Sequence, residues 1–76
     1  MKELVLYIAK ALVDSPEKVE VKEINGEKST IIELKVSDSD RGKIIGKEGR
    51  IIRAIRTIVS SASAKLNKRT TVELIE

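Results

Sequence analysis

The sequence predicts an α+β domain in which three helices cover one face of a three-stranded sheet. Apolar residues recur with helical spacing in two long segments, and they alternate with polar residues in three shorter ones. Two closely spaced glycines, Gly46 and Gly49, separate a short helical segment from a long one. The expected order is helix, strand, strand, helix, helix, strand, and residues 1–76 are expected to form one domain.

The first helix is expected over residues 2–13, where apolar residues are spaced three and four positions apart. These residues are Leu4, Val5, Ile8, Ala11 and Leu12. The helix should end before Pro16, because the residue that precedes a proline is pushed out of the helical region. Leu6 and Val13 are apolar residues beyond those expected on this packed face, and a self-association surface could use them.

A β-hairpin is expected to follow, because Val19 and Val21 alternate with charged residues. Asn25 and Gly26 are typical of a two-residue hairpin turn, which needs a positive φ at both positions. The return strand should cover residues 29–36. Its core-facing residues are expected to be Ile32, Leu34 and Val36, and its outward residues Ile31, Glu33 and Lys35.

The second half of the chain begins with Asp38, Ser39 and Asp40, which offer a helix N-cap to a short helix over residues 41–45. Gly46 should stop that helix. The long helix after Gly49 is expected to pack through Ile51, Ile55, Ile58 and Ala62, flanked by Ile52, Val59 and Leu66. Asn67 can take the left-handed conformation at its end. A closing strand is expected over residues 70–75, with Val72 and Leu74 facing the core.

The composition disfavours several classes of function. The chain has no Cys and no His, which removes the commonest nucleophiles, general bases and metal ligands, so we expect neither an enzyme nor a cofactor. Tyr7 is the only aromatic residue, so stacking platforms for bases are absent. The net charge of +3 suits a polyanionic partner. Lys10 interrupts the N-terminal apolar run, so we expect a soluble, cytoplasmic protein without a membrane span.

The most informative stretch is the segment Gly46, Lys47, Glu48 and Gly49, called the glycine loop below. Its glycines let the backbone turn sharply and let a phosphodiester approach without a Cβ in the way. The helix that follows presents its N-terminal N–H groups and positive dipole end to an anion. Arg50 adds positive charge beside the loop. Two glycines at this spacing also occur in an ordinary tight turn, so the motif alone is weak.

In its context the loop carries more weight. The spacing of Ile45, the two glycines and Ile52, the element order, and the flanking segments at 41–46 and 54–58 resemble the type II KH domain. More closely, the chain resembles the small bacterial single-KH-domain proteins of the KhpA family. The resemblance implies that the glycine loop clamps the backbone of about four nucleotides of single-stranded RNA. Bases would lie in a groove between the flanking helices and the adjacent strand.

The resemblance also assigns individual residues. The RNA-binding candidates are Lys43, Ile45, Gly46, Lys47, Glu48, Gly49, Arg50 and Arg53, with Ile52 and residues 33–36 lining the groove. Ile45 and Ile52 also suit a core role, and Lys43 and Arg53 a solvated one. Glu48 would repel a phosphate if it pointed inward, so it is expected to point to solvent and to leave the contact to the backbone, Lys47 and Arg50.

Association with other proteins is the last expectation. The apolar stripe of the long helix is wider than a small sheet covers, so Ala54 and Ile58 are candidates for a dimer interface. The family resemblance implies a homodimer and a heteromer with a larger RNA-binding protein that has its own KH domain. The alternative to an RNA chaperone or regulator is a protein interaction adaptor that keeps the KH fold and binds RNA weakly or not at all.

Overall fold

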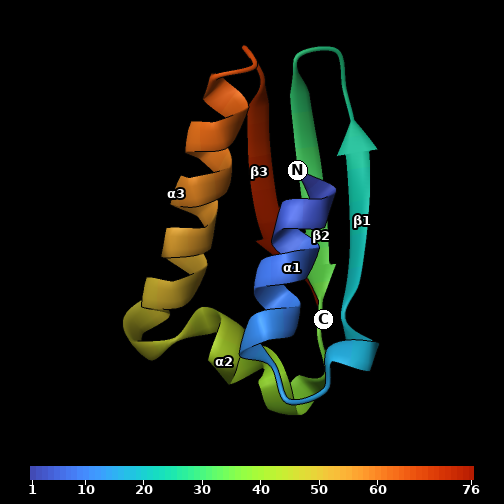
Figure 1. Ribbon diagram of the computed structural model, residues 1–76, viewed down its shortest axis with the longest axis vertical. Coiled ribbons are helices and arrows are strands. Elements are labelled where there is room, and N and C mark those ends of the chain that lie inside the picture. The colour runs from blue at the N-terminus through green and yellow to red at the C-terminus, as the bar shows by residue number, and fades with distance from the viewer.

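The computed structural model describes all 76 residues and has the predicted α+β architecture, with three helices and one three-stranded sheet (Figure 1). Short 3-10 turns connect several elements. The helices are α1 (Lys2–Leu12), α2 (Arg41–Ile45) and α3 (Arg50–Ala64), and the strands are β1 (Glu20–Asn25), β2 (Ser29–Lys35) and β3 (Arg69–Leu74). None of the helices combines the length and the apolar content needed to span a bilayer.

The sheet has β2 at its centre. β1 pairs with β2 in antiparallel orientation, with Val21 opposite Leu34. β3 pairs with β2 in parallel orientation, with Val72 opposite Ile32. A hairpin can join the antiparallel pair, whereas a parallel pair needs a crossover connection, and α2 and α3 supply it. The glycine loop therefore lies in the crossover, at one end of the sheet (Figure 1).

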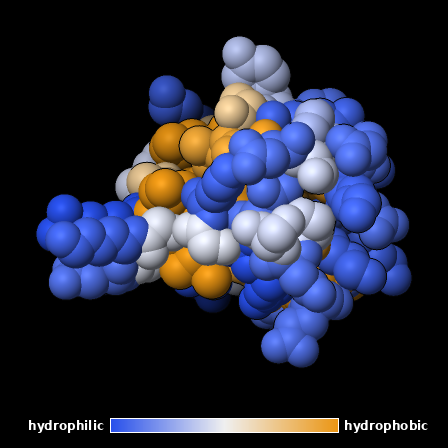
Figure 2. Space-filling view, turned by 90° about the horizontal axis from the view of Figure 1, so that it is seen from below, coloured by the Kyte–Doolittle hydropathy of each residue, from blue (hydrophilic) through white to orange (hydrophobic).

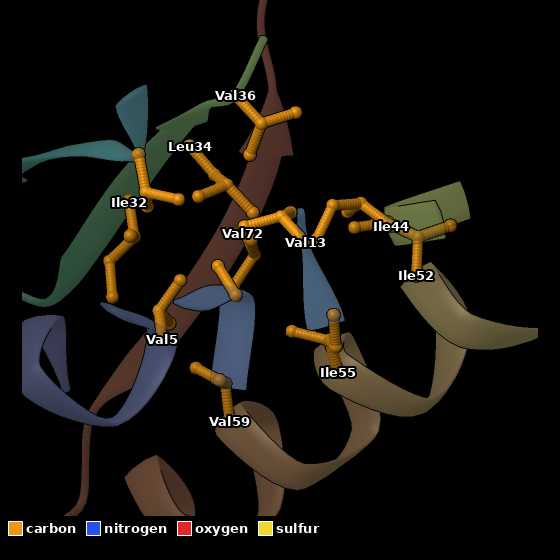
Figure 3. Packing of buried hydrophobic residues seen from close by; sticks show 12 residues of the cluster. Val5, Val13, Ile32, Leu34, Val36, Ile44, Ile52, Ile55, Val59 and Val72 are labelled. Atoms are coloured by element: carbon orange, nitrogen blue, oxygen red, sulfur yellow. The ribbon is translucent and has the colours of Figure 1, made fainter. Parts of the chain in front are cut away.

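The core lies between the helices and one face of the sheet. Figure 3 shows Val5 of α1, Ile44 of α2 and Ile55 of α3 directed toward the sheet residues Leu34 and Val72. The predicted alternation of β2 is confirmed, because its core-facing residues are buried and its outward residues lie on the opposite, wetter face. Leu74 of β3 packs against the same cluster as expected.

The packed faces of α1 and α3 differ from prediction. Ala9 is buried in α1 and Ala11 is exposed, while Val13 belongs to the core and is no surplus residue. In α3 the buried residues are Ile52, Ile55, Val59 and Ser63. The predicted packing of Ile55, flanked by Ile52 and Val59, is confirmed, whereas the prediction for Ile58 and Leu66 was wrong because both are exposed. The spacing of apolar residues in α3 is compatible with burial of either of two adjacent faces. Contact with β3 determines which face is buried. Ser63 is buried because its hydroxyl lies 2.6 Å from Thr70 Oγ1.

The hairpin turn also differs from prediction. Neither Asn25 nor Gly26 has a positive φ, and the loop between the strands is longer than two residues. Asn25 stays in β1 because its side-chain oxygen accepts a hydrogen bond from Thr30 Oγ1 on the partner strand, at 3.0 Å. The Gly26 N–H instead donates to the Ser29 carbonyl at 2.7 Å, which closes the turn. The expected left-handed Asn67 after α3 is confirmed, with a φ of 56°.

Asp40 is the one buried carboxylate, with 1% of its surface exposed. Sequence predicts an N-cap for α2 here, but its side chain makes no capping bond to α2. Its oxygens accept hydrogen bonds from the backbone N–H groups of Asp14 (3.1 Å) and Ser15 (3.0 Å), and from Ser37 Oγ (2.9 Å). Asp40 thus fastens the chain after α1 to the start of α2.

Burial by itself raises the pKa of Asp40, but the three hydrogen bonds outweigh it, helped by the positive charge of Lys43, and the pKa is lowered from its ordinary 3.8. A lowered pKa stabilises the folded protein at every pH above the unfolded value. The contribution is therefore complete above pH 3.8 and is lost as the pH falls through the lowered pKa.

We predict that Asp40→Asn lowers the urea midpoint at neutral pH, because one of the two acceptor oxygens becomes an amide donor that faces a backbone N–H group. The same variant should show less loss of stability than wild type when the pH falls below 3.8. Asp38→Asn is the matched control, since Asp38 is exposed in the same 3-10 turn and forms no ion pair. Equal midpoints for the two variants would contradict the anchoring role.

Candidate nucleic-acid interface

The glycine loop connects α2 to α3 through a run of unusual backbone angles. Gly46 has φ 75° and ψ 174°, Glu48 has φ 57° and ψ 25°, and Gly49 has φ 74° and ψ 16°. The Gly49 N–H donates to the Gly46 carbonyl at 3.1 Å, so the loop forms a single tight turn. Gly46 ends α2 as predicted, and α3 begins at Arg50 directly after the loop. The N-terminal end of α3 therefore lies beside the loop backbone.

The two glycines are required for different reasons. A Cβ on Gly46 would lie 2.6 Å from Ile51 Cγ1, so the first turn of α3 packs where a side chain would be. The backbone angles of Gly46 are also nearly exclusive to glycine. A Cβ on Gly49 would meet nothing within 4 Å. Gly46 therefore builds the turn, and Gly49 leaves an open approach to the backbone.

Two arginines of α3 contact Glu48. Arg53 Nη2 donates to the Glu48 carbonyl oxygen at 2.5 Å, and Arg50 Nη2 lies 3.7 Å from Glu48 Oε2. Glu48 is exposed as expected, but its carboxylate is paired and does not simply point into solvent. Lys47 is exposed and forms no ion pair. The loop thus presents one unpaired cation, Lys47, and the start of α3 presents Arg50, which already faces a carboxylate.

Two other candidates lie on α2. Lys43 is exposed and forms an ion pair with Asp14, whose hydrogen bond raises the pKa of the Lys43 ammonium above its ordinary 10.5. Sequence reasoning missed Asp14, because the two residues are far apart in the chain and only packing of α1 against α2 brings them together. Ile45 is 36% exposed at the end of α2, so it is a surface residue next to the loop.

The predicted groove is only partly assembled. Ile52 is buried in the core, and so are Leu34 and Val36, which makes all three unavailable to bases. Glu33 and Lys35 lie on the sheet face away from the helices. The residues that the structure does bring together are the glycine loop, Arg50, Arg53 and Ile45.

Figure 2 shows the end of the molecule that carries α2 and the loop, where apolar surface is exposed between hydrophilic side chains. The largest hollow, about 460 Å³, contains no loop residue. It is lined by Glu17, Lys18, Glu20, Lys35, Val36, Ser37 and Asp38, in which acids outnumber lysines. An anionic ligand is therefore better placed on the open surface at the loop than in this hollow.

Two further arginines that the sequence reasoning left unassigned have structural contacts. Arg56 Nε on α3 donates to the Val72 carbonyl at 3.0 Å, which ties α3 to the edge strand β3. Arg41 Nη1 at the start of α2 donates to the Ile75 carbonyl at 2.7 Å. Both guanidinium groups are engaged by the backbone, so we do not assign them to the interface. No sequence signal marks these partners, because each bond joins distant segments.

Comparison with known proteins gives consistent results. The KhpA/KhpB KH-domain family model matches residues 2–74. A protein of Clostridium perfringens named RNA-binding protein KhpA is 61% identical over 75 residues, 99% of this chain and 100% of that relative. Proteins of the same name from Borreliella burgdorferi and Aquifex aeolicus are 53% and 49% identical, covering 97% and 100% of this chain and 90% and 96% of those relatives. No solved structure matches the chain significantly.

We predict that Gly46→Ala destabilises the protein more than Gly49→Ala. At Gly49 only the left-handed backbone is penalised, by about 1–2 kcal/mol. At Gly46 the strained angles and the clash with Ile51 add up to about 3 kcal/mol or more. Urea denaturation measures both values, and Gly49→Asn is the control that tolerates the left-handed region. Equal losses at the two glycines would contradict the packing role of Gly46.

Proposed function

The chain belongs to the KhpA/KhpB KH-domain family, and from this premise we propose that it binds single-stranded RNA at the glycine loop. The observation that carries the proposal is the open backbone at Gly49, which lies between Lys47 and the N-terminus of α3. The relatives carry the name RNA-binding protein KhpA, which supports the same activity. The loop would clamp the backbone of about four nucleotides.

The binding chemistry follows from the side chains at the loop. A phosphate oxygen accepts hydrogen bonds from backbone N–H groups at the loop and the start of α3, and Lys47 and Arg50 add attraction without reading sequence. Ile45 offers an apolar contact to a base next to the clamp. Lys43 and Arg53 join the contact only by leaving Asp14 and the Glu48 carbonyl. With no aromatic platform at the site, we expect modest affinity.

We place this activity in an RNA chaperone or post-transcriptional regulator that acts in the cytoplasm and performs no chemistry on its ligand. The four-nucleotide clamp suits a single strand, since it grips one backbone and leaves base edges accessible. A duplex of the same length hides those edges and is expected to compete poorly.

Self-association is part of the proposal. Ala54 and Ile58 are exposed on α3, and Ile58 keeps 49% of its surface accessible. An exposed isoleucine on a helix face suits a symmetric contact with a second copy. The same face could serve a heteromer with a larger RNA-binding protein that has its own KH domain. If this association rather than the loop is the main activity, the protein is an adaptor, the second candidate function.

We predict that the pair of substitutions Lys47→Asp and Glu48→Asp abolishes RNA binding and leaves the fold intact. Both side chains are exposed, so the change in stability should be about 0.5 kcal/mol or less. Two carboxylates would then face the phosphate in place of a lysine. Gel shift and circular dichroism measure the two outcomes.

Salt dependence sharpens this test. Two to four phosphate contacts imply a slope of log affinity against log salt of about −1.4 to −2.8 for wild type on a single strand. A double variant that keeps the wild-type affinity and slope would place the RNA elsewhere on the domain. The adaptor function would then be the better proposal.

We also predict that Ile58→Asp converts a dimer into a monomer, because burial of a carboxylate in an apolar contact is unfavourable. Sedimentation at high micromolar concentration measures the state, and circular dichroism checks the fold. Ser60→Asp on the opposite side of α3 is the matched control and should remain dimeric. A monomeric wild type at this concentration would remove the dimer from the proposal.

A further inference from the structure

Glu48 is held by two arginines of the helix that it precedes. Arg53 Nη2 donates to its carbonyl oxygen at 2.5 Å, and Arg50 Nη2 lies 3.7 Å from its carboxylate. Both arginines come from the first four residues of α3 and reach back to the same loop residue. The only acidic residue of the glycine loop therefore lies beside two arginines.

The backbone conformation of residue 48 does not explain why a glutamate occupies this position. Its φ of 57° is left-handed, a region that costs most residues about 1–2 kcal/mol and that Gly, Asn and Asp tolerate better. The contacts of its side chain are with Arg50. The distinctive effect of this glutamate is thus the negative charge that it places beside that guanidinium.

A carboxylate and a phosphodiester compete for the same partner. Each is a monoanion whose oxygens accept hydrogen bonds from a guanidinium. The side chains of Arg50 and Glu48 are 73% and 69% exposed, so water screens their attraction and the pair exchanges readily. A phosphate arriving at the loop can therefore take the place of the carboxylate.

We infer that Glu48 is an internal phosphate mimic that occupies Arg50 in the free protein and must be displaced by the RNA backbone. This inference rests on the proposed function and adds a regulator of affinity to it. Glu48 lowers the affinity for any polyanion, because each ligand must break the pair with Arg50 before it can use that guanidinium. This cost is a smaller share of the binding free energy for a ligand that also contacts the loop backbone and Lys47.

The test is Glu48→Gln, which keeps the shape of the side chain and removes its charge. Affinity for a single-stranded oligonucleotide should rise by about two- to fivefold, the range expected for releasing an exposed ion pair. The slope of log affinity against log salt should stay close to wild type, because Arg50 contacts a phosphate in both proteins and only the cost of displacing Glu48 is removed.

Glu27→Gln is the matched control, because it changes the net charge equally. Glu27 is exposed in the β1–β2 turn, at the end of the sheet opposite the glycine loop (Figure 1). It should leave the affinity and the salt slope close to wild type. If both variants tighten binding to the same extent, net charge explains the effect and the inference fails.

A double-mutant cycle tests the route through Arg50. In an Arg50→Ala background, Glu48→Gln should give little further gain, because the arginine that it releases is missing. An undiminished gain in that background would overturn the mimic role. Weaker binding of Glu48→Gln would also overturn it, since Glu48 would then contribute directly to RNA recognition.

A ligand without bases separates this inference from the proposed function. A short inorganic polyphosphate chain is titrated while the amide resonances of the glycine loop are followed by NMR. If wild type binds no RNA but Glu48→Gln binds polyphosphate more tightly at the loop, the proposed function fails and the mimic stands. If neither ligand binds more tightly to Glu48→Gln than to wild type, the mimic role is rejected.

Discussion

The parallel pairing of β2 with β3 is the constraint on which the rest of the structure depends. Parallel neighbours cannot be joined by a hairpin, so the chain must cross the sheet from the end of β2 to the start of β3. α2 and α3 make that crossing and cover the apolar face of the strands on the way. The reversal between them is short and tight, and it places the glycine loop at the end of the sheet with the helix N-terminus beside it.

The two glycines of this reversal differ in their surroundings: Gly46 is packed and Gly49 is open. Gly46 is closed in by Ile51, so the loop geometry is fixed by the same contact that seats α3. Gly49 faces open space, so the backbone there is available to a ligand. Asp40 adds a second fixed point by holding the chain after α1 against the segment before α2. A rigid support thus carries an exposed loop, an arrangement that suits the proposed backbone clamp.

The electrostatics of the candidate interface are more balanced than the net charge of +3 suggests. Lys43 faces Asp14, Arg50 faces Glu48, and Arg53 is bound to a carbonyl, which leaves Lys47 as the loop cation without an acidic partner. Exposed pairs of this kind are weak and exchange with other ions. The surface is therefore one from which a polyanion can recruit cations at a modest cost, consistent with reversible and salt-dependent RNA binding as proposed.

The sequence by itself determined the element order, the alternation of β2 and the glycine loop, because each depends on residues that are neighbours along the chain or one helical turn apart. Tertiary structure decided which stripe of α3 is buried: Ser63 replaces Ala62 because Thr70 of β3 is there to bond it. It also decided the partners of Asp40 and Lys43, since contacts between distant segments leave no local pattern. The pairing of Glu48 is local in sequence but still depends on the fold, because Arg50 and Arg53 reach it only once α3 has formed.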